Sequence, residues 1–236
     1  MNLGVWSGPR NLSTAMMYSF AQRSDTAVWD EPFYAAYLVR TGLDHPVRDE
    51  IIATYENDPA KVIAKCTETR AGIFYQKQMC QHFLAGDDLS WVASLTNVLL
   101  IRHPQRVIAS YDAKRENPVA DDLGFGMQAK LYDLLIDLGQ QPIIIDAGDI
   151  RENPERMLTA LCDAIGISFE PAMLSWPKGG IADDGIWAKH WYPAVHNSTG
   201  FAGAEGPMPA LPQHLRSVLS DCLPDYERLY AERLTA

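Results

Sequence analysis

The sequence of 236 residues contains few cysteines, little positive charge and no long apolar run. Its four cysteines form no CxxC pair and no dense cluster, which excludes a disulfide framework or a cysteine zinc site and favours buried, reduced thiols. No apolar stretch approaches the roughly 18 residues of a membrane-spanning helix. The first residues, MNLGVWSGPR, lack the basic segment and apolar run of a secretory leader, so we expect a cytoplasmic protein without a membrane span.

Basic residues are outnumbered by acidic ones. The chain has 20 Lys and Arg against 30 Asp and Glu, a formal net charge of −10, which argues against nucleic acid as a partner. The excess is uneven, because residues 1–120 carry 12 basic and 13 acidic residues while residues 121–236 carry 8 and 17. A small anion held by the first half would therefore meet little opposing field. The sequence contains no heptad repeat, so it predicts no particular oligomeric state.

The composition, with 47% hydrophobic and 21% charged residues, is that of a folded globular protein. At about 100–200 residues per domain, the length predicts a single domain over residues 1–236. Apolar segments predict strands at residues 2–6, 26–30, 73–78, 97–101 and 142–146, with 62–66 as an alternative to 73–78. Because uniformly apolar strands alternate with helical patterns, we expect a three-layer α/β domain whose mostly parallel sheet is covered by helices on both faces.

Helical patterns fill most of the remaining chain, at residues 13–23, 34–40, 47–55, 79–85, 105–115, 123–138 and 153–166. Residues 176–212 break the alternation and are rich in glycine, proline and tryptophan. A loop of this length in a compact domain is usually functional. A helical tail follows at residues 211–234, and we expect Pro224 to interrupt it.

The loop after the first strand, SGPRNL at residues 7–12, combines several groups that bind anions. It leads into a helix N-terminus, and Ser7, Ser13 and Thr14 supply hydroxyls. Arg10 adds a guanidinium, so the loop suits a phosphate or sulfate. It is not a Walker A loop, because Leu12 stands where GxxxxGK[ST] needs lysine, which disfavours Mg²⁺-dependent hydrolysis of ATP or GTP. The alternative is an ordinary glycine-proline turn with a helix cap.

A second motif, IRHPQRVIASY at residues 101–111, follows another buried strand. Arg102 ends the strand and Ser110 lies on the next helix, so both side chains can reach one phosphate. The alternative makes Arg102 a surface ion-pair partner and Ser110 a neutral residue of the helix surface.

Together the two loops resemble the sulfotransferase family, which transfers a sulfuryl group from 3′-phosphoadenosine 5′-phosphosulfate (PAPS). Residues 9–14 are similar to the family's 5′-phosphosulfate loop, Pro-Lys/Arg-Ser-Gly-Ser/Thr-Thr, with Asn11 and Leu12 in place of Ser-Gly. Arg102-His103-Pro104 and Ser110-Tyr111 match its 3′-phosphate segment. The resemblance implies the P-loop nucleotide-kinase-like fold and a PAPS site formed by Ser7, Gly8, Pro9, Arg10, Asn11, Ser13, Thr14, Arg102 and Ser110.

A third segment is a partial match to the family's Arg-Lys-Gly…Gly-x-Trp-Lys loop over the nucleotide. Lys178 and Gly179 correspond to its Lys-Gly, and Pro177 stands where the family has arginine. By this resemblance Lys178 and Gly179 would also contact the nucleotide.

Sulfuryl transfer needs a base for the acceptor proton and a positive charge on the leaving phosphate. Glu31, in WDEPF just past the second strand, is the expected base, and some carbohydrate and bacterial sulfotransferases resemble this arrangement. Arg10 with the helix N-terminus would stabilise the leaving group without a metal. An exposed carboxylate at a helix start is the alternative for Glu31, and His82 and His103 are the other candidate bases. Lys77 either reaches the bridging oxygen of the donor, between sulfur and the 5′-phosphate, or is a solvated surface lysine.

Aromatic residues gather in the long loop, at Trp187, His190, Trp191 and Tyr192, where they would stack on adenine, cover an acceptor pocket or fill the core. The six histidines form no metal-ligand spacing, so no metal is expected. The sequence therefore predicts a PAPS-dependent sulfotransferase acting on a hydroxyl or amine of a small-molecule or carbohydrate acceptor. A P-loop kinase or NTPase with an atypical loop and a non-catalytic nucleotide-binding protein are the alternatives.

Overall fold

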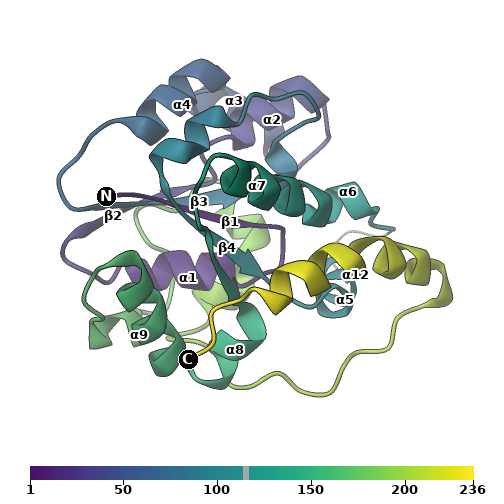
Figure 1. Cartoon of the computed structure of the whole chain (residues 1–236). Coiled ribbons are helices and arrows are strands. Elements are labelled where there is room, and N and C mark those ends of the chain that lie inside the picture. Colours follow the sequence, from purple (N-terminus) through teal and green to yellow (C-terminus); the bar gives the residue numbers. More distant parts are fainter. Residues whose placement is uncertain (114–116) are drawn as a thin grey trace.

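A computed structural model describes residues 1–113 and 117–236 of the chain and contains one central sheet among them. Its strands are β1 (Asn2–Ser7), β2 (Thr26–Asp30), β3 (Ile73–Met79), β4 (Thr96–Ile101) and β5 (Ile143–Asp146). Every pairing is parallel and the order is β2-β3-β1-β4-β5 (Figure 1). The predicted strands are confirmed to within one residue at each end, and residues 62–66 lie instead in the helix α4 (Pro59–Thr67).

Helices cover both faces of this sheet. The longer ones, besides α4, are α1 (Ser13–Phe20), α2 (Tyr34–Thr41), α3 (Arg48–Thr54), α5 (Pro104–Asp112), α7 (Phe125–Asp137), α8 (Ala147–Glu152), α9 (Pro154–Ile165) and α12 (Arg216–Ala231). One core cluster packs α1, α8 and α9 against the sheet, and a second packs α4, α5, α7 and α12 against its other face. The predicted three-layer architecture is confirmed.

The strand β4 shows why its sequence is uniformly apolar. Val98 and Leu100 belong to the core cluster on the α1 side, whereas Leu99 and Ile101 belong to the cluster on the α7 side. Successive side chains of a strand point to opposite faces, so a strand buried on both faces needs an apolar residue at every position.

Four predicted helices before the tail differ in part from the structure, and one of them, predicted over 13–23, ends at Phe20. The pattern at residues 79–85 forms only the single 3₁₀ turn η1 (Cys80–His82), because β3 extends through Met79. The helix predicted over 123–138 is divided at Gly124, whose φ of 74° separates α6 (Ala120–Leu123) from α7. The helix predicted over 105–115 begins at Pro104 and ends at Asp112; its positions 114 and 115 lie outside the described residues.

The tail is a continuous helix, contrary to the predicted interruption at Pro224. The helix α12 runs through Pro224, which is exposed, and the carbonyl of Ser220 that loses its partner is on an exposed residue too. Burial of Cys222, Tyr226 and Leu229 on the inner side of α12 outweighs the lost hydrogen bond.

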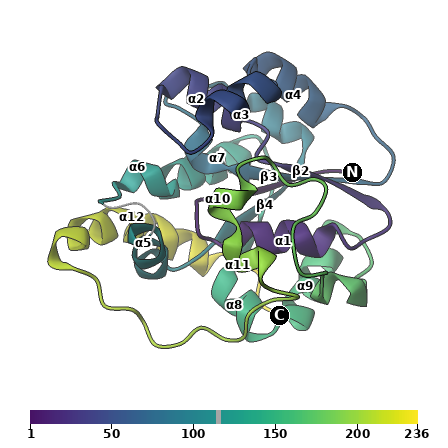
Figure 2. The same cartoon turned by 180° about the vertical axis from the view of Figure 1, so that it is seen from behind.

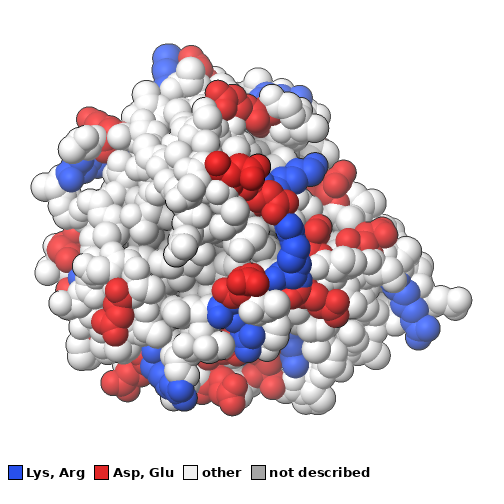
Figure 3. Space-filling view, viewed as in Figure 1, with Lys and Arg blue, Asp and Glu red and all other residues white. Residues whose placement is uncertain are grey.

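The long segment 176–212 contains two short helices, α10 (Ala188–Trp191) and α11 (Pro193–His196), which lie next to α1 (Figure 2). Residues after position 199 continue as an extended trace to the start of α12. On the face shown in Figure 3, acidic and basic side chains are intermingled, so the acidic excess is not collected into one surface there. Of the helices described, none has the length and apolar character needed to cross a bilayer.

Candidate functional site

A cavity of about 290 Å³ opens at the carboxyl edge of the sheet. The chain passes from β1 towards β2 on one side and from β4 towards β5 on the other, so β1 and β4 flank the point where ligands of open parallel sheets bind. The cavity is lined by residues 9–15, Glu31, Tyr34, His45, Lys77, Met79, Gln81, His82, Arg102, Ser110, Tyr111, Trp191, Tyr192, Ala194 and Val195.

The first loop leaves the N-terminus of α1 uncapped by any side chain. Its first intrahelical bond runs from the Met16 amide to the Leu12 carbonyl at 3.1 Å, so the N–H groups of Ser13, Thr14 and Ala15 lie ahead of the ladder. Leu12 has φ 71°, the left-handed conformation that glycine favours, at the position where the family pattern has glycine. Leu12 therefore keeps the backbone conformation of the family's glycine despite the substitution.

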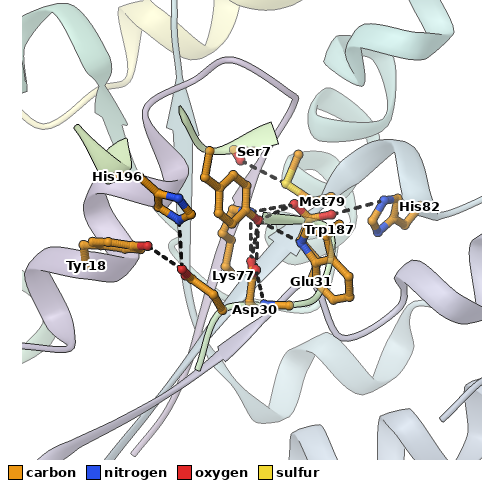
Figure 4. Close-up of polar contacts among 12 residues, drawn as sticks. Ser7, Tyr18, Asp30, Glu31, Lys77, Met79, His82, Trp187 and His196 are labelled. Atoms are coloured by element: carbon orange, nitrogen blue, oxygen red, sulfur yellow. Dashed lines mark hydrogen bonds and ion pairs between the residues drawn. The ribbon is translucent and has the colours of Figure 1, made fainter. Parts of the chain in front are cut away.

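Three other residues of this loop shape it. A Cβ on Gly8 would lie 2.0 Å from the carbonyl oxygen of Leu123, so only glycine fits there. Ser7 is buried, with Oγ 3.9 Å from the Met79 sulfur (Figure 4), and Asn11 donates from Nδ2 to the Leu100 carbonyl at 3.3 Å. Ser7 and Gly8 thus lie behind the lining.

The two predicted phosphate-binding motifs are in direct contact. Arg10 Nε donates to Ser110 Oγ at 2.9 Å, and Arg102 Nη1 donates to the Arg10 carbonyl at 2.8 Å. Burial, with the positive charge of Arg102, lowers the pKa of Arg10 below the ordinary arginine value. An anion in the cavity would relieve both penalties.

A buried group of polar side chains gathers around the ends of β2 and β3 (Figure 4). The register of β2 and β3 pairs Asp30 with Lys77, and Lys77 Nζ lies 2.9 Å from Asp30 Oδ1 and 2.6 Å from Glu31 Oε1. The Tyr192 hydroxyl is 2.6 Å from Lys77 Nζ, 2.8 Å from Asp30 Oδ1 and 2.9 Å from Glu31 Oε1. Trp187 Nε1 donates to the same hydroxyl at 3.0 Å, which ties the long loop to the strand ends.

These contacts set the charges of the group. Burial opposes the charge of Lys77, but Asp30 and Glu31 outweigh it and raise the pKa of Lys77, so the ammonium is retained. Burial raises the pKa of Asp30 and raises the pKa of Tyr192 well above the usual value. Tyr192 is therefore a neutral hydroxyl donor at pH 7.

Glu31 is held with one oxygen engaged and the other facing His82. Its Oε1 accepts from Lys77 and Tyr192, while Oε2 lies 3.7 Å from His82 Nε2, beyond ordinary hydrogen-bond distance. Glu31 is 8% exposed and has φ 43°, so the alternative of an exposed helix-start carboxylate is wrong. Lys77, 1% exposed, is likewise not a solvated surface lysine.

The family model described as a sulfotransferase domain matches residues 1–233. The chain belongs to this sulfotransferase family. Branched-chain-amino-acid aminotransferase-like proteins 2 and 1 of Arabidopsis thaliana are each 38% identical to it, over 229 and 226 residues. Both matches cover 95% of this chain and 40% of the relative, so the chain spans about 40% of the length of these curated proteins.

Solved sulfotransferase structures share the fold of the domain. The sulfotransferase domain from the Synechococcus PCC 7002 olefin synthase matches with a TM-score of 0.54 at 16% identity over 93% of both chains. The sulfotransferase domain from the curacin biosynthetic pathway has a TM-score of 0.54 at 18% identity over 93% of this chain and 96% of that one. The sulfotransferase from Alicyclobacillus acidocaldarius has a TM-score of 0.53 at 11% identity, over 99% and 96%. The predicted P-loop-like fold is confirmed.

Within this sulfotransferase domain, the candidate base His82 lies in the cavity and His103 does not. His82 is buried in the turn η1 and stacks on Tyr34 and Tyr37, and burial with the nearby Lys77 charge lowers its pKa well below the usual value. His103 accepts from the Gln105 amide at 3.2 Å as the cap of α5, outside the lining.

Part of the long segment reaches the sulfotransferase cavity. Trp191 and Tyr192 line it and Trp187 is buried behind Tyr192, whereas His190 is exposed. Lys178 is exposed, and Gly179 has φ 111° and donates from its amide to the His196 carbonyl at 2.9 Å. Both lie outside the lining.

Sequence reasoning missed a cluster of charges beside the second motif. Glu205 contacts Arg102 directly after β4, Arg106 in α5 and Arg151 in α8. The only sequence signal was that Arg102 and Arg106 are four residues apart, on either side of the start of α5. Over residues 1–113 and 117–236, three or more metal-ligating side chains do not gather at any point.

Proposed function

We propose that this sulfotransferase moves the sulfuryl group of PAPS to a hydroxyl or amine of a small-molecule or carbohydrate acceptor. The observation that carries the proposal is the 2.9 Å contact between Arg10 and Ser110, because it joins the loop expected at the 5′ side of the donor to the segment expected at its 3′ side. Arg10, Ser13, Thr14, Arg102 and Ser110 all line one cavity.

In this arrangement different residues would bind the 5′ and 3′ ends of the donor. The N–H groups at the start of α1, the hydroxyls of Ser13 and Thr14, and Arg10 would receive the 5′-phosphosulfate. Arg102 and Ser110 would hold the 3′-phosphate. The chemistry of the donor set, a helix N-terminus with hydroxyls and guanidinium groups, fits phosphate esters without a metal.

PAPS supplies a sulfuryl group activated by its bond to the 5′-phosphate. Glu31 Oε2 takes the proton of the acceptor as the new bond to sulfur forms, and the bond from sulfur to the phosphate oxygen breaks. The electron pair of that bond leaves with the 5′-phosphate, whose charge Arg10 and the N-terminus of α1 stabilise. Lys77 and Tyr192 hold Glu31 Oε1, so they fix the direction of Oε2.

The aminotransferase in the names of the plant relatives is not carried over to this chain. The sulfotransferase family model matches residues 1–233, and the match to each relative leaves most of that protein's length uncovered. We therefore assign sulfuryl transfer to this domain.

Calorimetry with 3′-phosphoadenosine 5′-phosphate, the product of the donor, tests the binding assignment. Arg10→Ala should weaken binding about 10–100-fold, because a hydrogen bond to a charged group is worth about 1.5–3 kcal/mol. Ser110→Ala should weaken it by about 2–10-fold. Arg228→Ala, which removes an exposed arginine paired with Asp133, is the matched control and should bind as the wild type does. Tight binding of ATP with no heat from this nucleotide would contradict the proposal and favour a kinase or NTPase.

Turnover separates an enzyme from a binding protein. Release of 3′-phosphoadenosine 5′-phosphate from PAPS is followed across a panel of hydroxyl and amine acceptors. Glu31→Gln should lower the rate by about 10²–10⁴-fold, because it removes general-base catalysis, and should leave the affinity for the product nucleotide within about twofold. Full turnover in Glu31→Gln would reject Glu31 as the base, and wild-type binding with no turnover for any acceptor would reject the enzyme assignment.

A further inference from the structure

One carboxylate, Glu205, is held by three arginines next to the cavity. Arg102 contacts Glu205 Oε1 from Nε at 2.8 Å and from Nη2 at 2.5 Å, and Arg151 Nη1 contacts the same oxygen at 3.1 Å. Arg106 Nε contacts Oε2 at 2.7 Å. The Glu205 side chain is only 9% exposed, so both oxygens are satisfied by protein donors rather than by open solvent.

The charges in this cluster do not balance. Three guanidinium groups face one carboxylate, which leaves about two positive charges, and Arg102 also lies beside Arg10. A phosphate monoester carries about −1.5 to −2 charges near pH 7 and offers three acceptor oxygens. Such a group would match the cluster better than the single carboxylate does, in charge and in the number of oxygens for bidentate arginines.

The segment that carries Glu205, residues 203–209, which we call the strap, is held mainly by polar contacts. Arg151 donates to the Gly203 carbonyl at 3.0 Å, Arg106 to the Gly206 carbonyl at 2.5 Å, and the side-chain Nε2 of Gln105 to the Pro209 carbonyl at 2.7 Å. A Cβ on Gly203 or Gly206 would meet nothing within 4 Å, and most strap residues are exposed. Figures 1 and 2 show the strap on the outside of the molecule, between α8 and α12.

The strap is therefore poorly anchored once its carboxylate is replaced. Segments with few buried apolar contacts and exposed hydrogen bonds open at low cost. The arginines that release Glu205 keep their positions, because they belong to the strand end of β4 and to the helices α5 and α8.

We propose that Arg102, Arg106 and Arg151 form the site of the donor's 3′-phosphate, and that Glu205 occupies it in cis until a nucleotide bearing that phosphate displaces it. This inference rests on the proposed PAPS function. It adds Arg106 and Arg151 to the binding residues and makes Glu205 a specificity-determining residue. A nucleotide with a 3′-hydroxyl carries no charge to replace the carboxylate, so it leaves the strap closed.

Calorimetry with two nucleotides, 3′-phosphoadenosine 5′-phosphate and adenosine 5′-phosphate, tests the inference. Glu205→Gln should raise the affinity for the first by about tenfold or more and leave that for the second within about twofold, because only the first competes with the carboxylate. Arg106→Ala and Arg151→Ala should weaken the first by about 10–100-fold and leave the second unchanged. Asp133→Asn, which removes a carboxylate from the exposed Arg228 pair, is the matched control.

The outcomes separate this inference from the proposed function. If the wild type binds both nucleotides equally weakly, the PAPS assignment fails and the inference fails with it. A second outcome is that the wild type prefers the nucleotide with the 3′-phosphate while Glu205→Gln binds that nucleotide with the same affinity as the wild type or more weakly. In that case the proposed function stands and the displacement of Glu205 is refuted.

Hydrogen exchange on the wild type gives a second test that needs no variant to fold. Addition of 3′-phosphoadenosine 5′-phosphate should increase exchange of the strap amides, while adenosine 5′-phosphate should not change it. A strap whose protection stays constant or increases with the 3′-phosphate would overturn the inference.

Discussion

Replacement of Lys77 by methionine should lower the free energy of unfolding by about 3–5 kcal/mol at pH 7, the cost of leaving buried carboxylates without their cation. Lys77 is 1% exposed and lies 2.9 Å from Asp30 and 2.6 Å from Glu31. At an effective dielectric constant of about 20, each contact contributes about 6 kcal/mol before the cost of burying the charges is subtracted. Methionine fills a similar volume, so little of the loss comes from a cavity.

The destabilisation should shrink as the pH falls. Without Lys77, Asp30 is buried beside Glu31 with no cation next to it, so Asp30 takes up a proton more readily than in the unfolded chain. The folded variant then binds more protons than its unfolded state, so its stability rises relative to the wild type between pH 7 and pH 5. In the wild type Lys77 is protonated throughout this range, so it takes up no further proton as the pH falls.

Urea unfolding followed by tryptophan fluorescence, at pH 7 and pH 5, measures both effects. The double variant Lys77→Met with Asp30→Asn should be more stable than Lys77→Met alone at pH 7, because it removes one uncompensated charge. This comparison also serves if the single variant is too unstable to purify. A Lys77→Met protein within about 1 kcal/mol of the wild type at both pH values would refute the reasoning.

Three further predictions concern residues at the end of β5 and in the loop after β1. Burial raises the pKa of Asp146 to about 6 from 3.8, so Asp146→Asn should raise the free energy of unfolding by up to about 3 kcal/mol at pH 8. The gain should fall as the pH drops from 6 towards 4, because the folded wild type then protonates this carboxyl; thermal melts from pH 4 to 8 check the slope. Leu12→Gly should be about 1 kcal/mol more stable than Leu12→Ala in urea unfolding, the reverse of the usual order, because φ is 71° there. Gly8→Ala should lower the melting temperature by several degrees, since its Cβ would lie 2.0 Å from a carbonyl oxygen, whereas Gly203→Ala should leave it within about one degree.

The order and type of most elements follow from local patterns. The strands β1, β2, β4 and β5 are short, mainly apolar runs that end at glycine or a charged residue, and burial on both faces makes that pattern unambiguous in β4. The helix predicted at residues 79–85 fails for a tertiary reason, since the parallel pairing of β3 with β1 extends to Met79 and takes the first residue of the helical pattern. The predicted interruption at Pro224 is wrong because the helix α12 is stabilised by packing of its inner face, which local sequence patterns do not include.

The part of the candidate site that follows from the order of the strands can be predicted from the sequence. Arg10 and Ser110 follow neighbouring strands, so their contact follows from the parallel sheet. The burial of Lys77 does not, because it depends on the register that places Asp30 opposite it and on Tyr192 from a distant segment. A lysine is read as exposed unless its partners are known.

Glu205 shows why a charge count by sequence half gives only part of the local field. The first half is nearly neutral and holds Arg102 and Arg106, but the acidic second half contributes the carboxylate that sits between them. If the strap is displaced in about 1% of free molecules, the affinity for the 3′-phosphate is lowered about 100-fold relative to an open site. Adenosine 5′-phosphate escapes this reduction because it binds with the strap closed. The same carboxylate therefore weakens the binding of the donor and makes that binding depend on the 3′-phosphate, so the open fraction measured by hydrogen exchange in the wild type should account for the gain in affinity of Glu205→Gln.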